Sequence, residues 1–299
     1  MYYELLEAGS GTYSPEEPDW VRVNFIGRSL SGDVFVTRSE DIAMEQGTKT
    51  PYTYYEPYYA YFNAYYSGLT TGQIEALKVM HQGDSVRLYL PSRLAYGANG
   101  TSFSNGYQGQ NALPANAPAI FEMKLVEIVP LPVEREKELV RDYAFKSMGL
   151  AVSEGVRIDS LYVQITNKIR RPNANVITQD STVYLYYVGK FLDDFIFDTN
   201  IDTIAQRVFK DYTQKSPLSY KSNDSSTSLI TAFQYLFEAP IPYLNDTIRY
   251  GDSVKMVFIS ALGYGESGNS PESGANGTVI QAYTPLVFEL VCRRTDDEE

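Results

Sequence analysis

Two stretches of the chain carry almost the same phrase: "QGDSVRLYLPSRLAYGANG" at 82–100 and "YGDSVKMVFISALGYGESG" at 250–268. Each holds Gly-Asp-Ser-Val, an apolar run and a closing Tyr-Gly pair. The flanks also repeat, in the same order and at nearly constant spacing. The matching blocks are "VNFIG" (23–27) with "LYYVG" (185–189), "GDVFVT" (32–37) with "DFIFDT" (194–199), and "LPANAPAIFEMKLV" (113–126) with "IQAYTPLVFELVCR" (280–293). The chain therefore contains two copies of one module.

Each copy has the apolar pattern of an antiparallel sheet with one short helix. Period-two alternation predicts strands at 20–27, 85–92 and 120–128, and again at 182–189, 253–260 and 286–292. Helical spacing predicts a short helix over 72–83, ended by Gly83, and another over 229–238, stopped by Pro240. The predicted fold class is α+β, with antiparallel strands around one short helix in each copy.

A helical stretch separates the copies. "PVEREKELVRDYAFKSMGL" has apolar residues at roughly helical spacing, with Pro132 at its start and Gly149 near its end. We therefore expect domain 1 over 1–131, a linker helix over 132–150 and domain 2 over 151–299. We expect the linker to join the domains rather than to carry chemistry.

Composition excludes several classes of site. The formal net charge is -12 and no Lys/Arg cluster is large enough to follow a phosphate backbone, so no nucleic-acid partner is expected. A single cysteine, Cys292, and a single histidine, His81, rule out an intrachain disulfide and a Cys/His zinc site. Cys292 shares a strand face with Phe288 and Leu290 and is expected to be a small buried residue, and His81 an exposed turn residue. No metal or cofactor is expected.

Two locations stay open. No apolar run approaches the roughly 18–20 residues that span a bilayer, and no signal peptide precedes the first strand. The chain suits a bacterial periplasmic or envelope protein whose leader has been removed, and it also suits a cytoplasmic one.

The repeated blocks, in this order, resemble the FKBP-type peptidyl-prolyl cis-trans isomerases. The family pattern has a strand "V-x-x-G", then "G-x-x-F-D", a short helix leading to "M-x-x-G-D", then "A-Y-G" and "I-P-x-x-A-x-x-x-F-x-x-x-L". The resemblance covers most of both copies. It implies a sheet curled around the short helix, with an aromatic pocket between them that accepts a proline ring. Tandem isomerases of this kind are often exported, sometimes as lipoproteins.

The resemblance implies a more complete pocket in the second copy. Asp198 is present after Phe197, Phe233 supplies an aromatic floor, and Tyr264 is the "A-Y-G" tyrosine. Copy two departs at "IQAYT", where the family has "I-P-x-x-A", and by insertions near 200–228 and 239–249. The implied pocket residues are Tyr187, Phe197, Asp198, Leu229, Ile230, Phe233, Tyr264, Ile280 and Phe288.

The first copy matches the pocket with two departures. Val36 stands where the family has aspartate, and Gln73 stands where the floor is aromatic. A buried amide at that floor must be hydrogen-bonded or wet. The implied residues are Phe25, Phe35, Leu69, Thr70, Gln73, Tyr96, Leu113 and Phe121. We expect this copy to bind more weakly, or only to support the other.

The tyrosine-rich insertion at 52–66, "YTYYEPYYAYFNAYY", falls where the family has the loop beside the pocket. Its rings suit packing onto their own domain, a contact surface for a protein or glycan, or a lid over the first pocket. Two function classes follow. One is a tandem prolyl isomerase and folding helper acting on exposed or unfolded Xaa-Pro segments, mainly through domain 2. The other is a non-catalytic binding or chaperone module, with a lectin as a more distant alternative.

Overall fold

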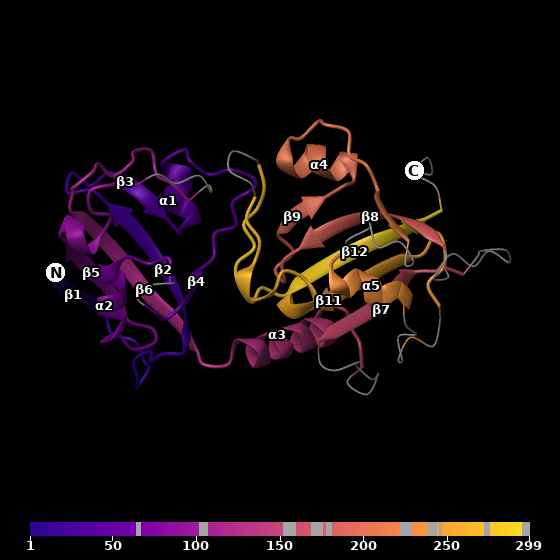
Figure 1. The fold of residues 1–299 in the computed structure, drawn as a ribbon, viewed down its shortest axis with the longest axis horizontal. Helices are drawn as coiled ribbons and strands as arrows, with labels where there is room; N and C mark the ends of the chain where they lie inside the picture. Colours follow the sequence, from indigo (N-terminus) through magenta and orange to yellow (C-terminus); the bar gives the residue numbers. More distant parts are fainter. Residues whose placement is uncertain are drawn as a thin grey trace. The chain divides into compact units, whose positions relative to one another are not determined.

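The structure is a computed structural model that describes residues 1–63, 67–101, 107–151, 160–168, 176–177, 181–221, 229–238, 244, 247–271 and 276–294. Two compact units make up the chain (Figure 1). Unit 1 is Met1–Pro132 with Pro271–Gln281, and unit 2 is Val133–Ser270 with Ala282–Glu299. The short segment 271–281 thus follows most of unit 2 in sequence but belongs to unit 1.

Unit 1 is built on a six-stranded antiparallel sheet. Its spatial order is β1-β5-β6-β2-β3, and β4 also pairs with β2. The strands are β1 (Tyr2–Glu7), β2 (Trp20–Arg28), β3 (Val34–Thr37), β4 (Tyr58–Tyr61), β5 (Ser85–Leu90) and β6 (Ala119–Val129). The period-two pattern is obeyed: Val21 and Val23 are fully buried, whereas Arg22 between them is half-buried and pairs with Glu127.

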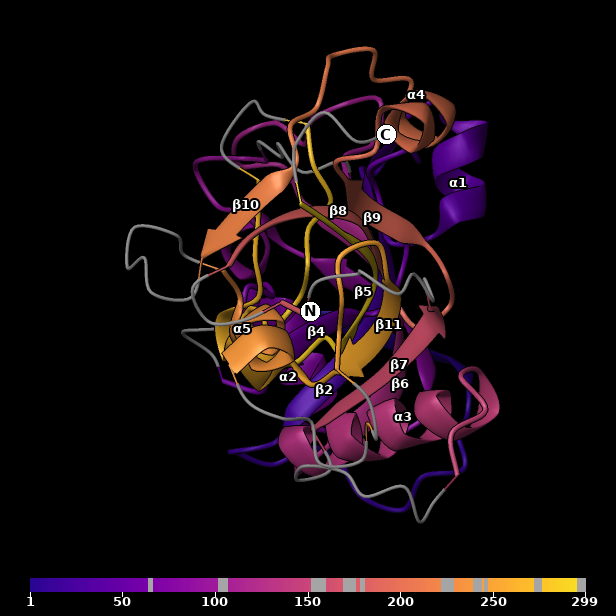
Figure 2. The ribbon, with the colours of Figure 1, turned by 90° about the vertical axis from the view of Figure 1, so that its right-hand side faces the viewer.

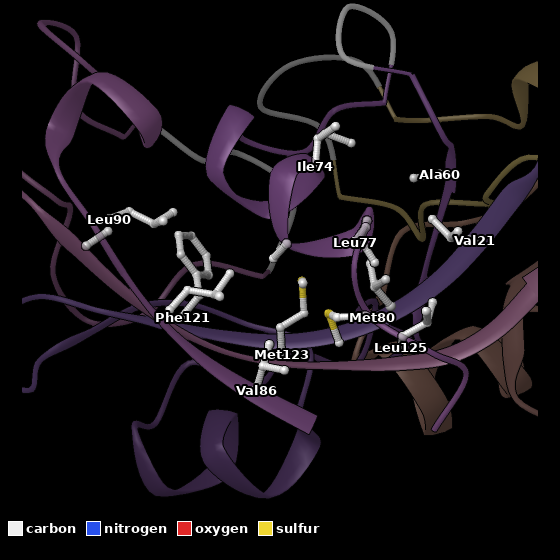
Figure 3. Close-up of a cluster of buried hydrophobic side chains, with 14 of the residues drawn as sticks. Val21, Ala60, Ile74, Leu77, Met80, Val86, Leu90, Phe121, Met123 and Leu125 are labelled. Carbon is white, nitrogen blue, oxygen red and sulfur yellow. The ribbon is translucent and has the colours of Figure 1, made fainter. Parts of the chain in front are cut away.

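The core of unit 1 lies between this sheet and α2 (Thr71–Leu77). Figure 3 shows Leu77 and Met80 beside Met123 and Leu125 of the sheet, all of them buried. The helix begins at a capping box, in which Thr70 caps the backbone N–H of Gln73 and Gln73 returns a bond to Thr70. Unit 1 also contains α1 (Glu40–Glu45) and the short turn η1 (Ser92–Leu94).

Unit 2 repeats the same sheet. Its order is β10-β8-β12-β11-β7, with β9 also paired to β8. Strands β7 to β12 therefore take the places of β1 to β6, one for one. They are β7 (Leu161–Asn167), β8 (Thr182–Lys190), β9 (Ile196–Thr199), β10 (Leu218–Lys221), β11 (Ser253–Phe258) and β12 (Leu286–Arg293). The helices are α4 (Asp202–Phe209) and α5 (Thr231–Glu238), with turns η2 (Ser260–Leu262) and η3 (Gly265–Ser267).

The hairpin formed by β2 and β3 in unit 1 has the same register as that formed by β8 and β9 in unit 2. Gly27 pairs with Val36 in unit 1, and Gly189 pairs with Asp198 in unit 2. The ladder shifts register directly after each glycine, at corresponding positions. Every residue on one hairpin therefore has a structural counterpart on the other, and the two can be compared residue by residue.

The expected linker helix forms as α3 (Pro132–Lys146) and packs on the sheet of unit 2. Figures 1 and 2 show it running along β7. Its buried Val140 and Ala144 lie in one cluster with Tyr162 and Val257 of the sheet. Full burial of a valine side chain such as that of Val140 contributes roughly 1.5–3 kcal/mol. Gly149, at φ +68°, lies just beyond the helix end, as the sequence predicts.

The sequence predictions of fold class and of the six strands and two short helices are confirmed, although the first helix ends at Leu77 and not at Gly83. The sequence did not reveal β1, β3, β4, β7, β9, β10, α1 or α4. Within the segment expected as an insertion near 200–228, α4 and β10 are counterparts of α1 and β4, so both copies carry this element pair. Most of 239–249 lies outside the described residues. Cys292 is fully buried and His81 exposed, as expected. Among the helices described, none is long and apolar enough to cross a membrane.

Candidate functional site

The expected pocket of unit 2 centres on Phe288 of β12. Its ring centroid lies 4.8 Å from that of Phe233 on α5, in an edge-to-face arrangement. Phe197 of β9 is 5.6 Å away and Tyr187 of β8 is 5.7 Å away. Three strands and a helix thus converge on one aromatic cluster, in the edge-to-face and tilted geometries that aromatic pairs prefer.

A glycine makes this close approach possible. A Cβ atom added to Gly189 would lie 2.7 Å from Cζ of Phe197 and 3.0 Å from Cε1 of Phe288. No side chain fits that space, so the glycine admits the two rings to the strand. The glycine at the end of this block was visible in both copies, but its steric role needed the structure. Gly27 plays the same part in unit 1, where an added Cβ would lie 2.6 Å from Cζ of Phe35.

Beside the rings of unit 2 lies a polar pair. The Tyr187 hydroxyl donates a hydrogen bond of 2.6 Å to Oδ2 of Asp198, whose Oδ1 accepts from the Thr199 N–H at 2.8 Å. Burial, and then the charge of Asp198, raises the pKa of Tyr187 above its usual 10.0. Burial and Asp198 also raise the pKa of Tyr264. Both hydroxyls therefore stay protonated near neutral pH and remain hydrogen-bond donors.

The remaining expected residues of the second pocket are placed differently. Leu229 is buried and Ile230 is half-buried, both directly before α5, and the Gln234 amide donates to the Leu229 carbonyl at 2.8 Å. Ile280 is buried, but it lies in segment 271–281 and so belongs to unit 1. Unit 2 by itself brings together Tyr187, Phe197, Asp198, Phe233, Tyr264 and Phe288.

Unit 1 has a corresponding aromatic cluster. Phe35 lies 5.7 Å from both Tyr96 and Phe121, and Phe25 lies 6.0 Å from Phe121. Leu113 is buried in the same core, and Leu69 packs against it. The rings expected from the sequence are therefore close together in this unit as well.

The polar pair of unit 2 has no counterpart in unit 1. Phe25 lacks the hydroxyl of Tyr187, and Val36 lacks the carboxylate of Asp198. Gln73 turns back to its own helix, where Oε1 accepts from the N–H and the Oγ1 of Thr70 at 2.9 Å each. Its Nε2 is buried without a hydrogen-bond partner. The amide at the pocket floor is thus only half satisfied.

Three residues near this pocket were not predicted from the sequence: Arg38, Tyr58 and Tyr107. Cζ of Arg38 lies 3.6 Å from the Tyr107 ring centroid and 4.7 Å from that of Tyr58. Tyr58 in turn packs edge-on against Phe25 at 6.4 Å. The available signal was the alignment of "FVTR" (35–38) with "FDTN" (197–200), which puts an arginine where the other copy has Asn200.

The arrangement in unit 2 suits the binding of an apolar ring beside a polar bond. The aromatic rings form an apolar surface, and the Tyr264 hydroxyl can donate to a carbonyl oxygen, whereas the Tyr187 hydroxyl already donates to Asp198. Within the described residues, no group of three or more His, Cys, Asp or Glu side chains is placed to hold a metal ion. The chemistry that these side chains support is binding and orientation.

Comparison with known proteins finds a family to which the first copy is similar. A family model described as FKBP-type peptidyl-prolyl cis-trans isomerase matches residues 11–126. The macrophage infectivity potentiator of Trypanosoma cruzi is 29% identical over 128 residues, covering 43% of this chain and 53% of that protein. The isomerase FkpA of Escherichia coli K12 is 27% identical over 135 residues, covering 44% of this chain and 39% of that protein.

The chain thus spans only about half, or less, of these relatives. Among solved structures, the three FKBP domains of wheat FKBP73 align with 98% of this chain and 93% of that one, at 15% identity and a TM-score of 0.34. The evidence for a second module comes instead from this chain itself, in the repeated blocks and the repeated strand order.

Proposed function

We propose that the protein accelerates cis/trans exchange of Xaa-Pro bonds, on the basis of the match of residues 11–126 to the FKBP-type peptidyl-prolyl cis-trans isomerase model, and that unit 2 is its main catalytic unit. The observation that carries the assignment to unit 2 is the 2.6 Å hydrogen bond from Tyr187 to Asp198, set beside the rings of Phe197, Phe233 and Phe288. Unit 1 keeps the rings but lacks this pair.

Cis/trans exchange is a rotation about the peptide bond, in which no covalent bond is formed or broken. Rotation about a peptide bond loses its partial double-bond character, at a barrier of roughly 18–20 kcal/mol. The two isomers of Xaa-Pro differ by only about 0.5–1 kcal/mol, so the exchange is slow rather than uphill. A planar amide is more polar than a twisted one. An apolar pocket therefore disfavours the planar ground state relative to the twisted transition state.

In this proposal the rings of Phe197, Phe233 and Phe288 hold the proline, and Tyr264 donates to a peptide carbonyl to hold the twisted geometry. Asp198 fixes the direction of the Tyr187 hydroxyl and keeps a negative charge at the exposed edge of the pocket. No step needs a nucleophile or a bound cofactor.

The test is cis/trans exchange in a short Xaa-Pro peptide, measured by NMR with the full chain. Tyr264→Phe removes one hydroxyl from the proposed catalytic unit, and Tyr96→Phe removes its counterpart from unit 1. We expect the first variant to lose up to about tenfold in kcat/KM, because a hydrogen bond to a neutral carbonyl contributes roughly 0.5–1.5 kcal/mol. The second should keep the full rate.

We expect Phe233→Ala to lower the exchange rate more strongly than Tyr264→Phe does. Circular dichroism must show that the Phe233→Ala variant is folded. Activity lost through Tyr96→Phe alone would place catalysis in unit 1. No acceleration by the folded wild-type chain would reject the isomerase and leave the second candidate, a non-catalytic binding or chaperone module.

A contact surface for a protein or glycan at 52–66 is a further proposal with less support. Within the described part, 52–63, no tyrosine is exposed: Tyr59 is buried, Tyr55 packs against Tyr107 at 5.9 Å, and Tyr61 packs against Trp20 at 5.5 Å. Residues 64–66 lie outside the described residues. These contacts favour rings that pack onto their own unit. Binding to a glycan array that survives Tyr61→Ala would argue against any role of these rings in recognition.

We also propose that the protein works in the bacterial periplasm or cell envelope, as a mature exported protein. Scarcity of cysteine and loops rich in Asn, Thr, Ser and Tyr support the proposal. Fractionation of producing cells, with a cytoplasmic enzyme as marker, tests it directly.

A further inference from the structure

One side chain of unit 1 is buried without the partners its charge requires. Arg38 is 7% exposed, and its Nε and Nη1 atoms are buried with no hydrogen-bond partner. In the described part of the chain, no carboxylate lies within ion-pair distance of its guanidinium. The neighbouring acid, Glu56, is engaged with Arg22, at 3.7 Å from Oε2 to Nη2. Burial lowers the pKa of Arg38, and it outweighs the hydrogen bond with the Tyr107 hydroxyl and the charge of Glu56, which act in the opposite direction. Arg38 is therefore a buried cation with two nitrogens, Nε and Nη1, that lack acceptors.

Contacts with aromatic rings offset only part of the free-energy cost of burying the Arg38 charge. Tyr107, Tyr58 and Phe25 surround the guanidinium, with ring centroids 3.6, 4.7 and 6.0 Å from Cζ. Such contacts are worth up to about 2 kcal/mol when desolvated. They act on the faces of the guanidinium, whereas its N–H bonds point outward in the plane. An uncompensated buried charge costs several kcal/mol, so the rings alone leave Arg38 destabilising.

The other copy shows that the fold does not require an arginine here. Asn200 occupies the corresponding position, and its side chain completes the edge of β8 by accepting from the Tyr187 N–H at 2.7 Å and donating to the Leu185 carbonyl at 2.8 Å. Asparagine at this position thus hydrogen-bonds two backbone groups of the adjacent strand. A buried cation with unpartnered donors at this position requires another explanation, and a functional role or a bound ion is among the explanations that such groups have.

A second orphan donor belongs to the same candidate pocket. Nε2 of Gln73 is buried without a partner at the start of α2. Unit 1 has also lost the negative group of the pocket, since Val36 stands where unit 2 has Asp198. Arg38 adds unpartnered donors and a positive charge beside Phe25 of this candidate pocket, and the ligand group that answers both is an anion with two acceptor oxygens.

We propose that the aromatic pocket of unit 1 binds peptides through a carboxylate, to which the Arg38 guanidinium donates the hydrogen bonds that it lacks in the free protein. The carboxylate comes from an Asp or Glu beside an apolar residue or from a chain end. Arginine is well suited to this role because its planar fork matches a carboxylate. This binding site is separate from the proposed catalysis in unit 2.

The experiment compares three peptides by calorimetry with the full chain. They are acetyl-Ala-Glu-Pro-Phe-amide, the neutral acetyl-Ala-Gln-Pro-Phe-amide, and the Gln peptide with a free terminal carboxylate. The neutral amide measures the affinity that needs no carboxylate, including that of unit 2. Charge-assisted hydrogen bonds predict about tenfold or more tighter binding of at least one acidic peptide. Whichever acidic peptide binds more tightly identifies the source of the carboxylate.

Two variants connect this preference to Arg38. Arg38→Met keeps most of the side-chain volume but removes the charge, and should bring the three affinities together. Arg87→Met is the control, because it removes the same charge from a surface ion pair, with Nη2 2.8 Å from Oε1 of Glu122. It should leave the preference intact.

A stability readout separates this role from a structural one. If Arg38 is an unpaired buried charge, Arg38→Met should raise the thermal midpoint of unit 1 while removing the preference. Equal affinities for all three peptides, or a preference that survives Arg38→Met, would overturn the proposal. So would a folded-state loss in Arg38→Met, because it would mean that the charge supports the fold. Isomerase activity enters none of these outcomes, so this proposal and the proposed function can fail independently.

Discussion

At the mouth of the two pockets the copies differ by one hydroxyl and one carboxylate. Tyr187 and Asp198 form a hydrogen bond of 2.6 Å, whereas their counterparts Phe25 and Val36 have no polar atoms in their side chains. The pair places a carboxylate and a phenol oxygen next to an aromatic surface. Since the rest of the hairpin shares its register, this difference is the simplest physical basis for the proposal that unit 2 is the main catalytic unit.

Tyr187→Phe should therefore make unit 2 resemble unit 1. We expect a loss of about tenfold in kcat/KM, because a hydrogen bond to a charged acceptor contributes roughly 1.5–3 kcal/mol. The measurement is the NMR exchange rate of an Xaa-Pro peptide. Phe25→Tyr is the control: the new hydroxyl faces Val36, which offers no acceptor, so the rate should not change. An unchanged rate in Tyr187→Phe would remove the pair from the mechanism.

Gly189 is predicted to be intolerant of any side chain. An added methyl group would lie 2.7 Å from the ring of Phe197, so Gly189→Ala must displace rings that line the pocket. Overpacking of this kind costs about 1–3 kcal/mol, measured as a lower urea midpoint. Gly27→Ala makes the matched clash with Phe35 in unit 1. Both variants should lose stability, but only Gly189→Ala should lose isomerase activity. Equal loss of activity in both would contradict the assignment to unit 2.

At the scale of elements, α3 is fixed to its sheet by a buried carboxylate. Glu136 is 1% exposed, and it accepts from the Ser260 N–H at 2.7 Å and from the Ser260 hydroxyl at 2.8 Å. Burial is the largest influence on this group and raises its pKa above the usual 4.5, although the two hydrogen bonds act in the opposite direction. The folded state therefore holds the Glu136 proton more tightly than the unfolded chain.

This raised pKa gives a stability difference with a defined sign. The folded state gains from protonation of Glu136, so the contribution is fully present below pH 4.5 and is lost as pH rises through the folded-state pKa. Glu136→Gln does not titrate, so the free energy of unfolding of wild type minus that of the variant should fall between pH 4 and pH 7. Urea titrations at several pH values measure it. A difference that rises with pH would show that the hydrogen bonds outweigh burial.

Strands with one buried face and one solvent-facing face were predictable from the sequence, whereas the strand β1, which is exposed on both faces, was not. In β2 and β6 one face is buried, so apolar residues alternate and the pattern is visible. All six residues of β1 are exposed, so no burial imposes a pattern on "YYELLE". The apolar face of α3 was visible as helical spacing, but the sheet that it covers was not, because that depends on contacts between distant parts of the chain.

Some residues of the candidate site were likewise predictable from the sequence, and others were visible only in the structure. Pocket residues within repeated blocks, such as Phe197 and Phe288, were found because the blocks keep their order. Arg38 was missed because its significance depends on what surrounds it: its N–H bonds the Phe25 carbonyl at 2.9 Å, and Tyr107 reaches it from a distant loop. Ile280 aligned with the second pocket, but segment 271–281 belongs to unit 1, which no local pattern indicates.

At the scale of the whole molecule, duplication has not produced two units that are each continuous in sequence. Unit 1 is completed by segment 271–281, in which Gln281 is 7% exposed. Its Oε1 accepts from the Tyr59 N–H at 2.8 Å, and its Nε2 donates to the Pro57 carbonyl at 3.1 Å. One amide thus satisfies two backbone groups at the start of β4. A fragment that ends at residue 131 lacks this amide.

Gln281→Ala should therefore destabilise unit 1 although the residue lies late in the chain. A buried N–H left without its acceptor costs about 1–3 kcal/mol. Hydrogen exchange of the Tyr59 amide in the full chain should accelerate accordingly, while amides of β11 and β12 keep their protection. Glu266→Ala, on the exposed turn η3 of unit 2, is the control and should leave the Tyr59 amide unchanged. If Tyr59 stays as protected in Gln281→Ala as in wild type, the late segment is not part of the fold of unit 1. The fragment 1–131 would then be expected to be as stable as unit 1 in the intact protein.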